Sequence, residues 1–224
     1  MSTTFWLPSS GARAVTVAPS AASWTLHINA AAAALLRMVL DRSNTALTSI
    51  AYAPDAADHL VDGSAMCMQY VSDILPPQVI PAQQILFGAR CLEAVATNNL
   101  FPAWKLYAVT ADGATPLGDI VPYFKSALAE MATSLTGYCE VRAGSALTLN
   151  APFRLVLEIG ASGLPTNTAT DTHNHTYAVG DPMATGAGNC IQQADNTAAA
   201  PELTFSNELV TKFQRGRARA LVGI

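Results

Sequence analysis

Three residues are best placed to act together chemically: Asp171, His173 and His175, which alternate in the stretch Asp-Thr-His-Asn-His. Residues two apart in a strand point to the same side, so this carboxylate and the two imidazoles could bind one divalent metal ion. No other cluster of such ligands is evident in the sequence, and a polar loop also collects histidines by chance. We therefore interpret the stretch as an exposed loop and predict no metal site and no bound cofactor.

Known catalytic motifs are missing from the sequence. It contains no Gly-x-Ser-x-Gly elbow, P-loop, dinucleotide fingerprint or His-Glu-x-x-His helix. Glu93, Glu140 and Glu158 fall in predicted strands, where a facing pair of carboxylates could hydrolyse a glycoside. We favour the alternative, in which these carboxylates lie on solvated strand faces. The sequence thus predicts no catalytic residue and no enzymatic activity.

The clearest structural pattern lies at residues 153–160, Phe-Arg-Leu-Val-Leu-Glu-Ile-Gly. The alternation is typical of a half-buried strand, which places the phenylalanine, the two leucines and the isoleucine on the core. Arg154, Val156 and Glu158 then share the opposite face, which the pattern alone would leave in water. Because the chain is poor in charge, we expect this face to contact another subunit instead.

Similar short runs recur between Pro, Gly, Asn and Asp residues. They are residues 5–7, 24–28, 45–52, 66–72, 84–95, 104–110, 136–142, 146–150, 176–179 and 202–206. Asp112-Gly113 favours a hairpin turn, and Pro122 makes residues 116–124 an edge strand or a loop. Residues 126–135 have helical composition, whereas residues 30–40 fit either a helix or a continued strand.

These patterns predict an all-β fold, a jelly-roll-like antiparallel β-sandwich with one or two short helices and a C-terminal extension. We expect one domain at residues 1–206, followed by an extension or arm at residues 207–224. Residues 160–200 are rich in Thr, Asn, Gly and Ala and have little hydrophobic pattern, which is typical of a long loop.

The low charge content of the chain indicates which kinds of macromolecule it could bind. Only 12% of the residues are charged, against roughly 25% in an ordinary soluble domain. Such a surface suits a subunit largely covered by neighbours, although an alanine-rich genome would have the same effect. The net charge of −4 argues against a nucleic-acid partner. Arg215, Arg217 and Arg219 could touch phosphate or an acidic neighbour, but we favour a solvated tail.

Membrane and redox signals are also weak. The N-terminus lacks the basic and apolar regions of a signal peptide, and the apolar run at residues 30–36 is too short to span a bilayer. We therefore expect synthesis in a cytoplasm and no membrane partner. The four cysteines are scattered without a Cys-x-x-Cys spacing, which favours free thiols over a disulfide framework.

Several segments together resemble β-sandwich structural proteins of tailed-bacteriophage and prophage virions. They are Phe5-Trp6-Leu7-Pro8-Ser9-Ser10-Gly11, Trp24, Gln69-Tyr70-Val71-Ser72, Ala111-Asp112-Gly113, Arg154-Leu155-Val156-Leu157-Glu158-Ile159-Gly160, Tyr177, Gly180-Asp181-Pro182 and Leu203-Thr204-Phe205-Ser206. The resemblance runs to about Ser206 and implies no catalytic residues. The run at residues 30–40 and the extension at 207–224 depart from the pattern.

The resemblance implies a structural component of a bacteriophage virion, made in the host cytoplasm and placed in the tail, at a fibre attachment or as decoration on the capsid surface. We expect it to form a homo-oligomer and to contact other virion proteins. The alternative is a carbohydrate- or receptor-binding sandwich that docks on a host-surface glycan. Exposed aromatic side chains near the loop at residues 160–200 would favour this alternative. Of the three tryptophans, Trp6 is the best candidate for an exposed contact, since Trp24 and Trp104 lie in apolar strands. A sandwich-fold glycan hydrolase ranks last.

Overall fold

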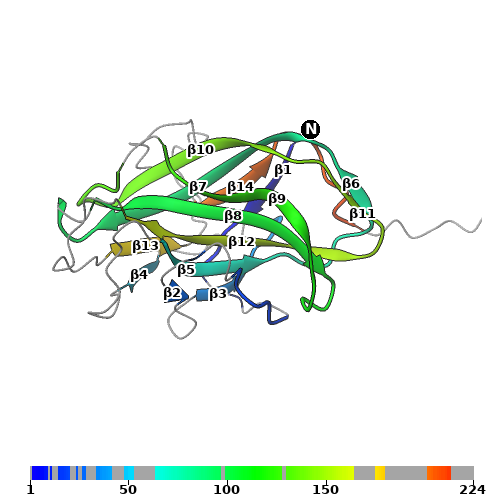
Figure 1. The fold of residues 1–224 in the computed structure, drawn as a ribbon, viewed down its shortest axis with the longest axis horizontal. Coiled ribbons are helices and arrows are strands. Elements are labelled where there is room, and N and C mark those ends of the chain that lie inside the picture. The colour runs from blue at the N-terminus through cyan, green and yellow to red at the C-terminus, as the bar shows by residue number, and fades with distance from the viewer. Residues whose placement is uncertain are drawn as a thin grey trace, which may run out of the picture.

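Two six-stranded β-sheets face each other in the computed structural model (Figure 1). The structure describes residues 2–9, 11, 15–20, 24, 27–28, 34–41, 48–52, 64–96, 99–127, 130–163, 175–179 and 201–212. Within these ranges the regular elements are strands and no α-helix is present. The predicted fold class, an all-β sandwich built from antiparallel sheets, is confirmed.

The first sheet is organised around β7 (Gln83–Glu93). One edge of β7 pairs with β10 (Thr136–Gly144) over nine residues, and the other edge pairs in turn with β14 (Glu202–Phe205) and β13 (His175–Val179). Two outer strands complete the sheet: β1 (Thr3–Trp6) beside β14, and β4 (Thr48–Tyr52) beside β13.

The second sheet is organised around β12 (Phe153–Ser162). Its neighbours are β5 (Ser64–Val71) on one side and β8 (Phe101–Thr110) on the other, both antiparallel. Beyond β8 lies β9 (Pro116–Lys125), an edge strand as the proline at position 122 predicts. Two short strands, β2 (His27–Ile28) and β3 (Ala34–Arg37), pair with β5 in parallel.

The hairpin between β8 and β9 has the turn that Asp112-Gly113 predicts. Gly113 adopts a φ of 80°, the left-handed conformation that glycine reaches without steric strain. The Thr110 amide donates to the Thr115 carbonyl at 2.9 Å and closes the turn. A separate ribbon, β6 (Gln78–Ile80) with β11 (Leu147–Leu149), lies at one end of the sandwich, on the right in Figure 1.

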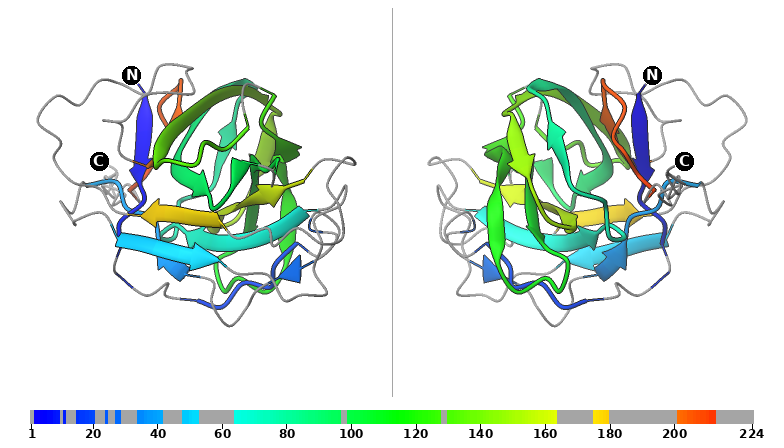
Figure 2. Two further views of the ribbon diagram at one scale, coloured as in Figure 1. Left: turned by 90° about the vertical axis from the view of Figure 1, so that its left-hand side faces the viewer. Right: turned by 90° about the vertical axis from the view of Figure 1, so that its right-hand side faces the viewer.

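The core lies between the sheets and contains the inward residues that the β12 pattern predicts, Phe153, Leu155, Leu157 and Ile159. Aromatic rings join the two sheets, with Phe87 of β7 in edge contact with Phe124 of β9 at 5.2 Å between ring centroids. Such contacts add to the stabilisation that burial of apolar surface provides. Figure 2 shows the two layers from the two ends of the molecule.

The outer face of β12 corrects a prediction. Arg154, Val156 and Glu158 are 6%, 0% and 0% exposed, so this face contacts neither water nor another subunit. It is covered by the N-terminal part of the same chain. Val17 packs against Val156 together with β-strand residues Val71, Tyr107 and Val109, and Trp24 lies farther along the same face.

Other predictions are corrected at the level of single elements. The helix expected at 126–135 is absent from its described residues, 126–127 and 130–135. In the 30–40 run, residues 34–37 form β3, and residues 30–33 lie outside the described ranges. The boundary proposed between residues 206 and 207 stays a prediction. A search of the described residues finds no helix long and apolar enough to span a membrane.

The cysteines differ from the prediction in one respect. Cys67 and Cys91 are buried free thiols, as expected. Cys139 is disulfide-bonded, and its partner lies outside the described residues. Wide spacing in the sequence does not exclude a disulfide, because a sheet fold brings distant residues together.

Candidate functional site

The buried carboxylate of Glu158 is the most heavily hydrogen-bonded acidic group in the described structure. Its Oε1 accepts hydrogen bonds from the Tyr107 hydroxyl at 2.8 Å, the Ser20 amide at 3.0 Å and Gln69 Nε2 at 3.1 Å. Its Oε2 accepts one from Trp24 Nε1 at 2.8 Å. A buried charge is tolerated when its lone pairs are occupied in this way.

Lys105 continues this polar row across the sheet, because it is the Cα partner of Glu158 on β8. Its ammonium donates to Ser20 Oγ at 2.8 Å and lies 3.1 Å from the Asp119 carboxylate. Tyr107 is held beside it, and both burial and the Glu158 charge raise the pKa of its hydroxyl. The hydrogen bonds of Glu158 and Lys105 to Ser20, and of Glu158 to Trp24, hold the N-terminal segment against the sheet.

The other two strand carboxylates are buried too, so the predicted solvated faces are wrong for all three. Glu93 is 1% and Glu140 3% exposed. Glu140 forms an ion pair with Arg142, whose guanidinium lies 4.6 Å from the Phe124 ring centroid. Burial raises the pKa of Glu93 to about 7, with a smaller contribution from the neighbouring Glu130 carboxyl. The three carboxylates lie on different strands and share no cleft.

The residues first considered for a metal site are only partly described. Asp171 and His173 lie outside the described ranges. His175 belongs to β13 and is 1% exposed, whereas we expected an exposed loop. Its Nε2 lies 3.0 Å from Sγ of Cys67 on the facing sheet. Within the described ranges, no three His, Cys, Asp or Glu residues are grouped to hold a metal ion.

His175 is part of a buried polar cluster in the core. Tyr177 lies two residues along β13 and donates its hydroxyl to the Gly160 carbonyl at 2.5 Å. Burial raises the pKa values of the Cys67 and Cys91 thiols and of the Tyr177 hydroxyl. A neutral, enclosed thiol is a poor nucleophile, so this cluster links the sheets and offers no reactive group at the surface.

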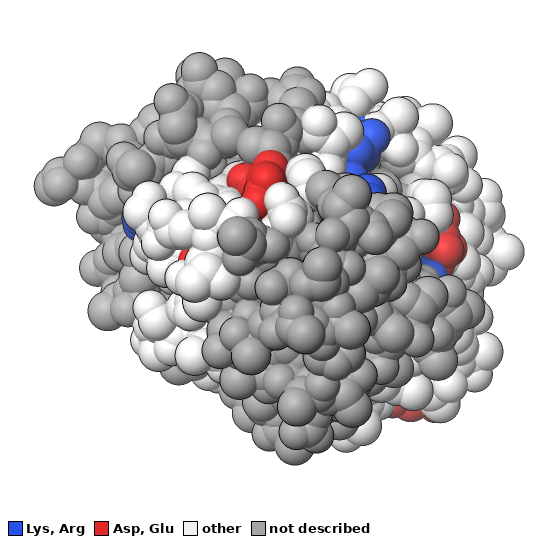
Figure 3. All heavy atoms as spheres, turned by 60° about the vertical axis from the view of Figure 1, so that its left-hand side comes forward, with Lys and Arg blue, Asp and Glu red and all other residues white. Residues whose placement is uncertain are grey.

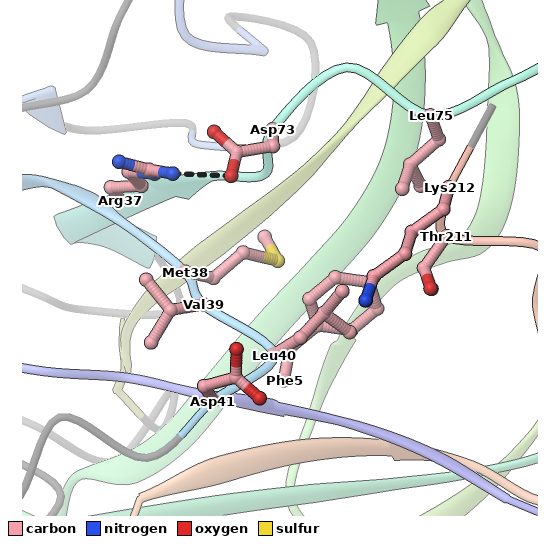
Figure 4. A pocket seen from close by; sticks show the side chains of 10 residues that line it. All are labelled: Phe5, Arg37, Met38, Val39, Leu40, Asp41, Asp73, Leu75, Thr211 and Lys212. Carbon is pink, nitrogen blue, oxygen red and sulfur yellow. Dashed lines mark hydrogen bonds and ion pairs between the residues drawn. The ribbon is translucent and has the colours of Figure 1, made fainter.

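A surface hollow lies at the corner where the two ends of the described chain meet. Its volume is about 410 Å³, which falls in the range of small-ligand pockets. Its floor consists of Phe5, Met38 and Leu75, which are at most 2% exposed. Charged side chains form its rim, and Figure 4 shows Arg37 and Asp73 joined on one side and Thr211 and Lys212 on another.

A second hollow of about 400 Å³ shares four of these lining residues. The shared residues are Leu40, Asp41, Thr211 and Lys212. It extends along β1 past Ser2 and Thr4 toward Glu208. We call the two hollows together the β1 groove. An apolar floor with charges of both signs at the rim suits an extended peptide better than a small anion or a metal ion.

Sequence patterns did not identify the β1 groove. Arg37 and Asp41 bound the apolar run at 30–40, and Lys212 precedes the arginine cluster, but nothing in the sequence relates them to Asp73. These four charged residues come from three segments that are distant in the sequence. The segments meet through the pairing of β1, β3 and β14 with their neighbouring strands. Of the aromatic residues singled out from the sequence, Trp24 and Trp104 are buried, and Trp6 is half-buried.

Comparisons with known proteins were made by sequence and by structure. No protein-family model and no curated protein matches the chain. A CocE/NonD family hydrolase from Staphylococcus aureus is similar over 84% of this chain and 36% of its own, at 8% identity and a TM-score of 0.43. An aminopeptidase from a marine-sediment Thaumarchaeota archaeon is similar over 80% and 36%, at 10% identity and a TM-score of 0.45.

A viral structure is among the more distant neighbours. The infectious bursal disease virus Gt strain is similar over 72% of this chain and 35% of its own, at 12% identity and a TM-score of 0.30. The chain therefore spans about a third of the length of the structures it matches. At this identity and TM-score the match assigns no role to this chain, and no family model supports the bacteriophage resemblance.

One prediction is contradicted by these comparisons. We predicted that the chain is not an enzyme, and the neighbours include proteins described as a hydrolase and an aminopeptidase. That prediction is withdrawn. Likeness at this identity and TM-score indicates neither a substrate nor a catalytic residue in this chain.

Proposed function

We propose that this chain is a structural component of a bacteriophage virion and acts by assembling with further copies of itself and with neighbouring virion proteins. The bacteriophage assignment is supported by the sequence resemblance, which runs from residue 5 to about residue 206. Assembly is supported by one structural observation in particular, exposed aliphatic side chains on and beside the β6–β11 ribbon.

This surface, the ribbon face, is defined by Ile74, Val79 and Val210. Their side chains are 39%, 60% and 45% exposed, although a valine or isoleucine is normally buried. Val210 is fixed beside the ribbon, because its amide and its carbonyl both hydrogen-bond the Gln78 side chain, at 2.9 and 2.8 Å. Exposed apolar side chains that recur at one end of a fold are typical of a protein contact surface.

The distribution of charge supports the same role. The chain has few charged residues, and several of them, including Glu158, Lys105 and Arg154, are used inside the fold. On the face drawn in Figure 3, uncharged side chains make up most of the described surface. Little electrostatic repulsion then opposes contact between copies.

The glycan-binding alternative lacks comparable support. Platforms for sugars need exposed aromatic rings, and the exposed large hydrophobic side chains of the described residues are all aliphatic. Trp6, the candidate identified from the sequence, is half-buried.

Two measurements test the proposal. Mass spectrometry of gradient-purified particles from the encoding phage or prophage should detect the chain as a stoichiometric component. Light scattering of the purified protein should show a multimer that dissociates in the Val79→Asp/Val210→Asp variant. Val95→Asp is the matched control, because Val95 is 48% exposed but lies outside the ribbon face. A chain absent from particles, and monomeric at every concentration, would refute the proposal.

A further inference from the structure

Among the described residues, only Val39 pairs with β1 on the side away from β14. The Trp6 amide donates to the Val39 carbonyl at 2.7 Å, and the Val39 amide donates to the Trp6 carbonyl at 3.1 Å. The backbone polar groups of Trp6 therefore point away from β14. Since these directions alternate along a strand, the amide and carbonyl of Thr4 point to the same side.

Beyond this bridge the chain that carries Val39 turns away. Residues 40 and 41 form a bend, so Asp41 does not continue the pairing opposite Thr4. Within the described ranges, β1 is the last strand of its sheet, and no strand pairs with it on this side. Figure 2 shows β1 in blue at the outer side of the sheet, beside β14 in orange. The β1 groove runs along this edge, because Ser2, Thr3, Thr4 and Phe5 line its two hollows.

We propose that the β1 groove binds residues 213–224 of a second copy of this chain, which adds to the sheet as a strand beside β1. This inference rests on the assembly proposed above and names its surface and its partner. Addition of a strand to an open edge gains affinity from main-chain hydrogen bonds and specificity from alternate side chains. It would also cover an edge that otherwise invites non-specific pairing.

The sequence of the segment suits the groove. Residues 215–220 read Arg-Gly-Arg-Ala-Arg-Ala, so an extended conformation places three arginines on one face and three small residues on the other. The groove rim carries the carboxylates of Asp41 and Glu208, both exposed. Arginines on the outer face of an added strand could pair with these carboxylates, and the small residues on its other face would let it lie close to the wall.

The position of the chain end favours exchange between two copies. Thr211 and Lys212 line the groove, so the segment that follows begins at the site where the partner's segment would bind. In a dimer with two-fold symmetry, the C-terminal segment of each copy would start beside its own β1 groove and bind in the groove of the other copy. The two contacts would then be identical. Twelve extended residues reach roughly 40 Å, enough to cross to a neighbouring subunit.

A proline substitution tests the strand addition directly. The Thr4 amide faces the groove, so Thr4→Pro removes a donor for the incoming strand and leaves the β1–β14 ladder intact. Thr4→Ala is the matched control, because both variants lose the 2.8 Å contact between the Thr4 and Thr204 hydroxyls. In sedimentation velocity of the full chain, we expect Thr4→Pro to weaken self-association at least tenfold and Thr4→Ala to change it less than twofold.

Charge reversal tests the identity of the partner. Asp41→Lys/Glu208→Lys and Arg215→Glu/Arg217→Glu/Arg219→Glu should each weaken self-association at least tenfold in the full chain. Combining both sets in one chain should restore it to within threefold of the wild type. Circular dichroism melting curves of each variant verify that it is folded. Restoration by the combined variant supports the proposal, and its failure in folded protein overturns the proposal.

Two other outcomes separate this inference from the proposed function. If the groove and segment variants remain multimers while the ribbon-face variant dissociates, the segment does not mediate assembly, and the inference fails while the proposed function stands. Hydrogen exchange at residues 2–6 is the second measurement, and protection should rise with protein concentration. Protection that is independent of concentration would assign the groove to the chain's own segment and overturn binding by a second copy.

Discussion

Trp24 Nε1 donates a 2.8 Å hydrogen bond to Oε2 of Glu158 on the outer face of β12. Trp24 comes from the N-terminal segment that crosses the second sheet, and its ring makes an edge contact with Tyr123 of β9 at 5.1 Å. The pair is 134 residues apart in sequence. One tryptophan thus both covers the sheet and supplies a donor to the carboxylate beneath it, which explains how a charged residue lies at 0% exposure.

Replacement of Glu158 should lower the stability of the folded protein. Glu158→Gln keeps the shape but replaces a charged acceptor by an amide, whose NH₂ group would face a donor such as Trp24 Nε1–H. Because hydrogen bonds to charged groups contribute about 1.5–3 kcal/mol and unsatisfied buried donors cost a similar amount, we expect a loss of about 2–4 kcal/mol in the free energy of unfolding. Urea denaturation at pH 7 measures it. Gln84→Glu, the reverse change at an exposed position of β7, should change stability by less than about 0.5 kcal/mol.

The glycine that follows Ile159 should tolerate no side chain. A Cβ at Gly160 would lie 2.0 Å from the Ala65 carbonyl oxygen and 2.6 Å from the Trp24 ring. Gly160→Ala must therefore shift the backbone of β5 and also displace the Trp24 ring, and we expect a loss of about 2–4 kcal/mol in the free energy of unfolding, as for other overpacked or strained core sites.

Gly144→Ala is the matched control for this substitution. It also lies in a strand, but the nearest atom to its added Cβ is the flexible end of Ile85, at 2.7 Å. We expect a loss smaller by at least 1 kcal/mol in thermal or urea unfolding. Equal losses at the two positions would show that the close approach of Trp24 to Gly160 is not a special constraint.

Much of the fold could be predicted from the sequence. Alternation predicted most of the strands to within a few residues, and Asp112-Gly113 predicted the hairpin correctly. Pro122 indicated an edge strand or a loop, and the structure has the edge strand. These signals are local, since side-chain direction and turn conformation depend on residues close in sequence. The same alternation identified the inward face of β12.

The sequence could not show what covers the other face of a strand. Glu158 alternates with apolar residues as a solvated carboxylate would, and it is buried because residues 15–20 and Trp24 lie over this face of the sheet. That segment has no periodic pattern of its own. The helix predicted at residues 126–135 was wrong for a related reason, because helix propensity is a weak local preference that tertiary packing overrides. The β1 groove combines residues from several distant segments, so no spacing in the sequence could reveal it.

The buried thiols should be inert in the native protein. Cys67 and Cys91 are 4% and 0% exposed, and burial raises both pKa values, so little thiolate forms and reagents cannot reach it. After iodoacetamide treatment at pH 8, peptide mapping should find both unmodified in native protein and modified in urea. A cysteine introduced by Val95→Cys, at a 48% exposed position outside the ribbon face, should react fully under native conditions. Native labelling of Cys67 within minutes would contradict the packing described for the core.

Stability should fall as the pH rises through the range in which Glu93 titrates. Its pKa is raised from 4.5 to about 7, first by burial and then by the neighbouring Glu130. Between these two values the folded protein holds a proton on Glu93 that the unfolded chain has released, so raising the pH favours unfolding. At about 1.4 kcal/mol per pKa unit, the expected loss from pH 4.5 to 7.5 is on the order of 3 kcal/mol.

Glu93→Gln isolates this contribution from those of other titrating groups. The amide does not titrate, and its carbonyl oxygen can still accept the hydrogen bond that the Leu100 amide donates to Glu93 at 3.2 Å. The difference in unfolding free energy between wild type and variant should therefore decrease steadily from pH 4.5 to 7.5 and become constant above it. Parallel pH profiles for wild type and Glu93→Gln would mean that Glu93 is ionised in the folded protein across this range, and that its burial is compensated by hydrogen bonding instead of by a bound proton.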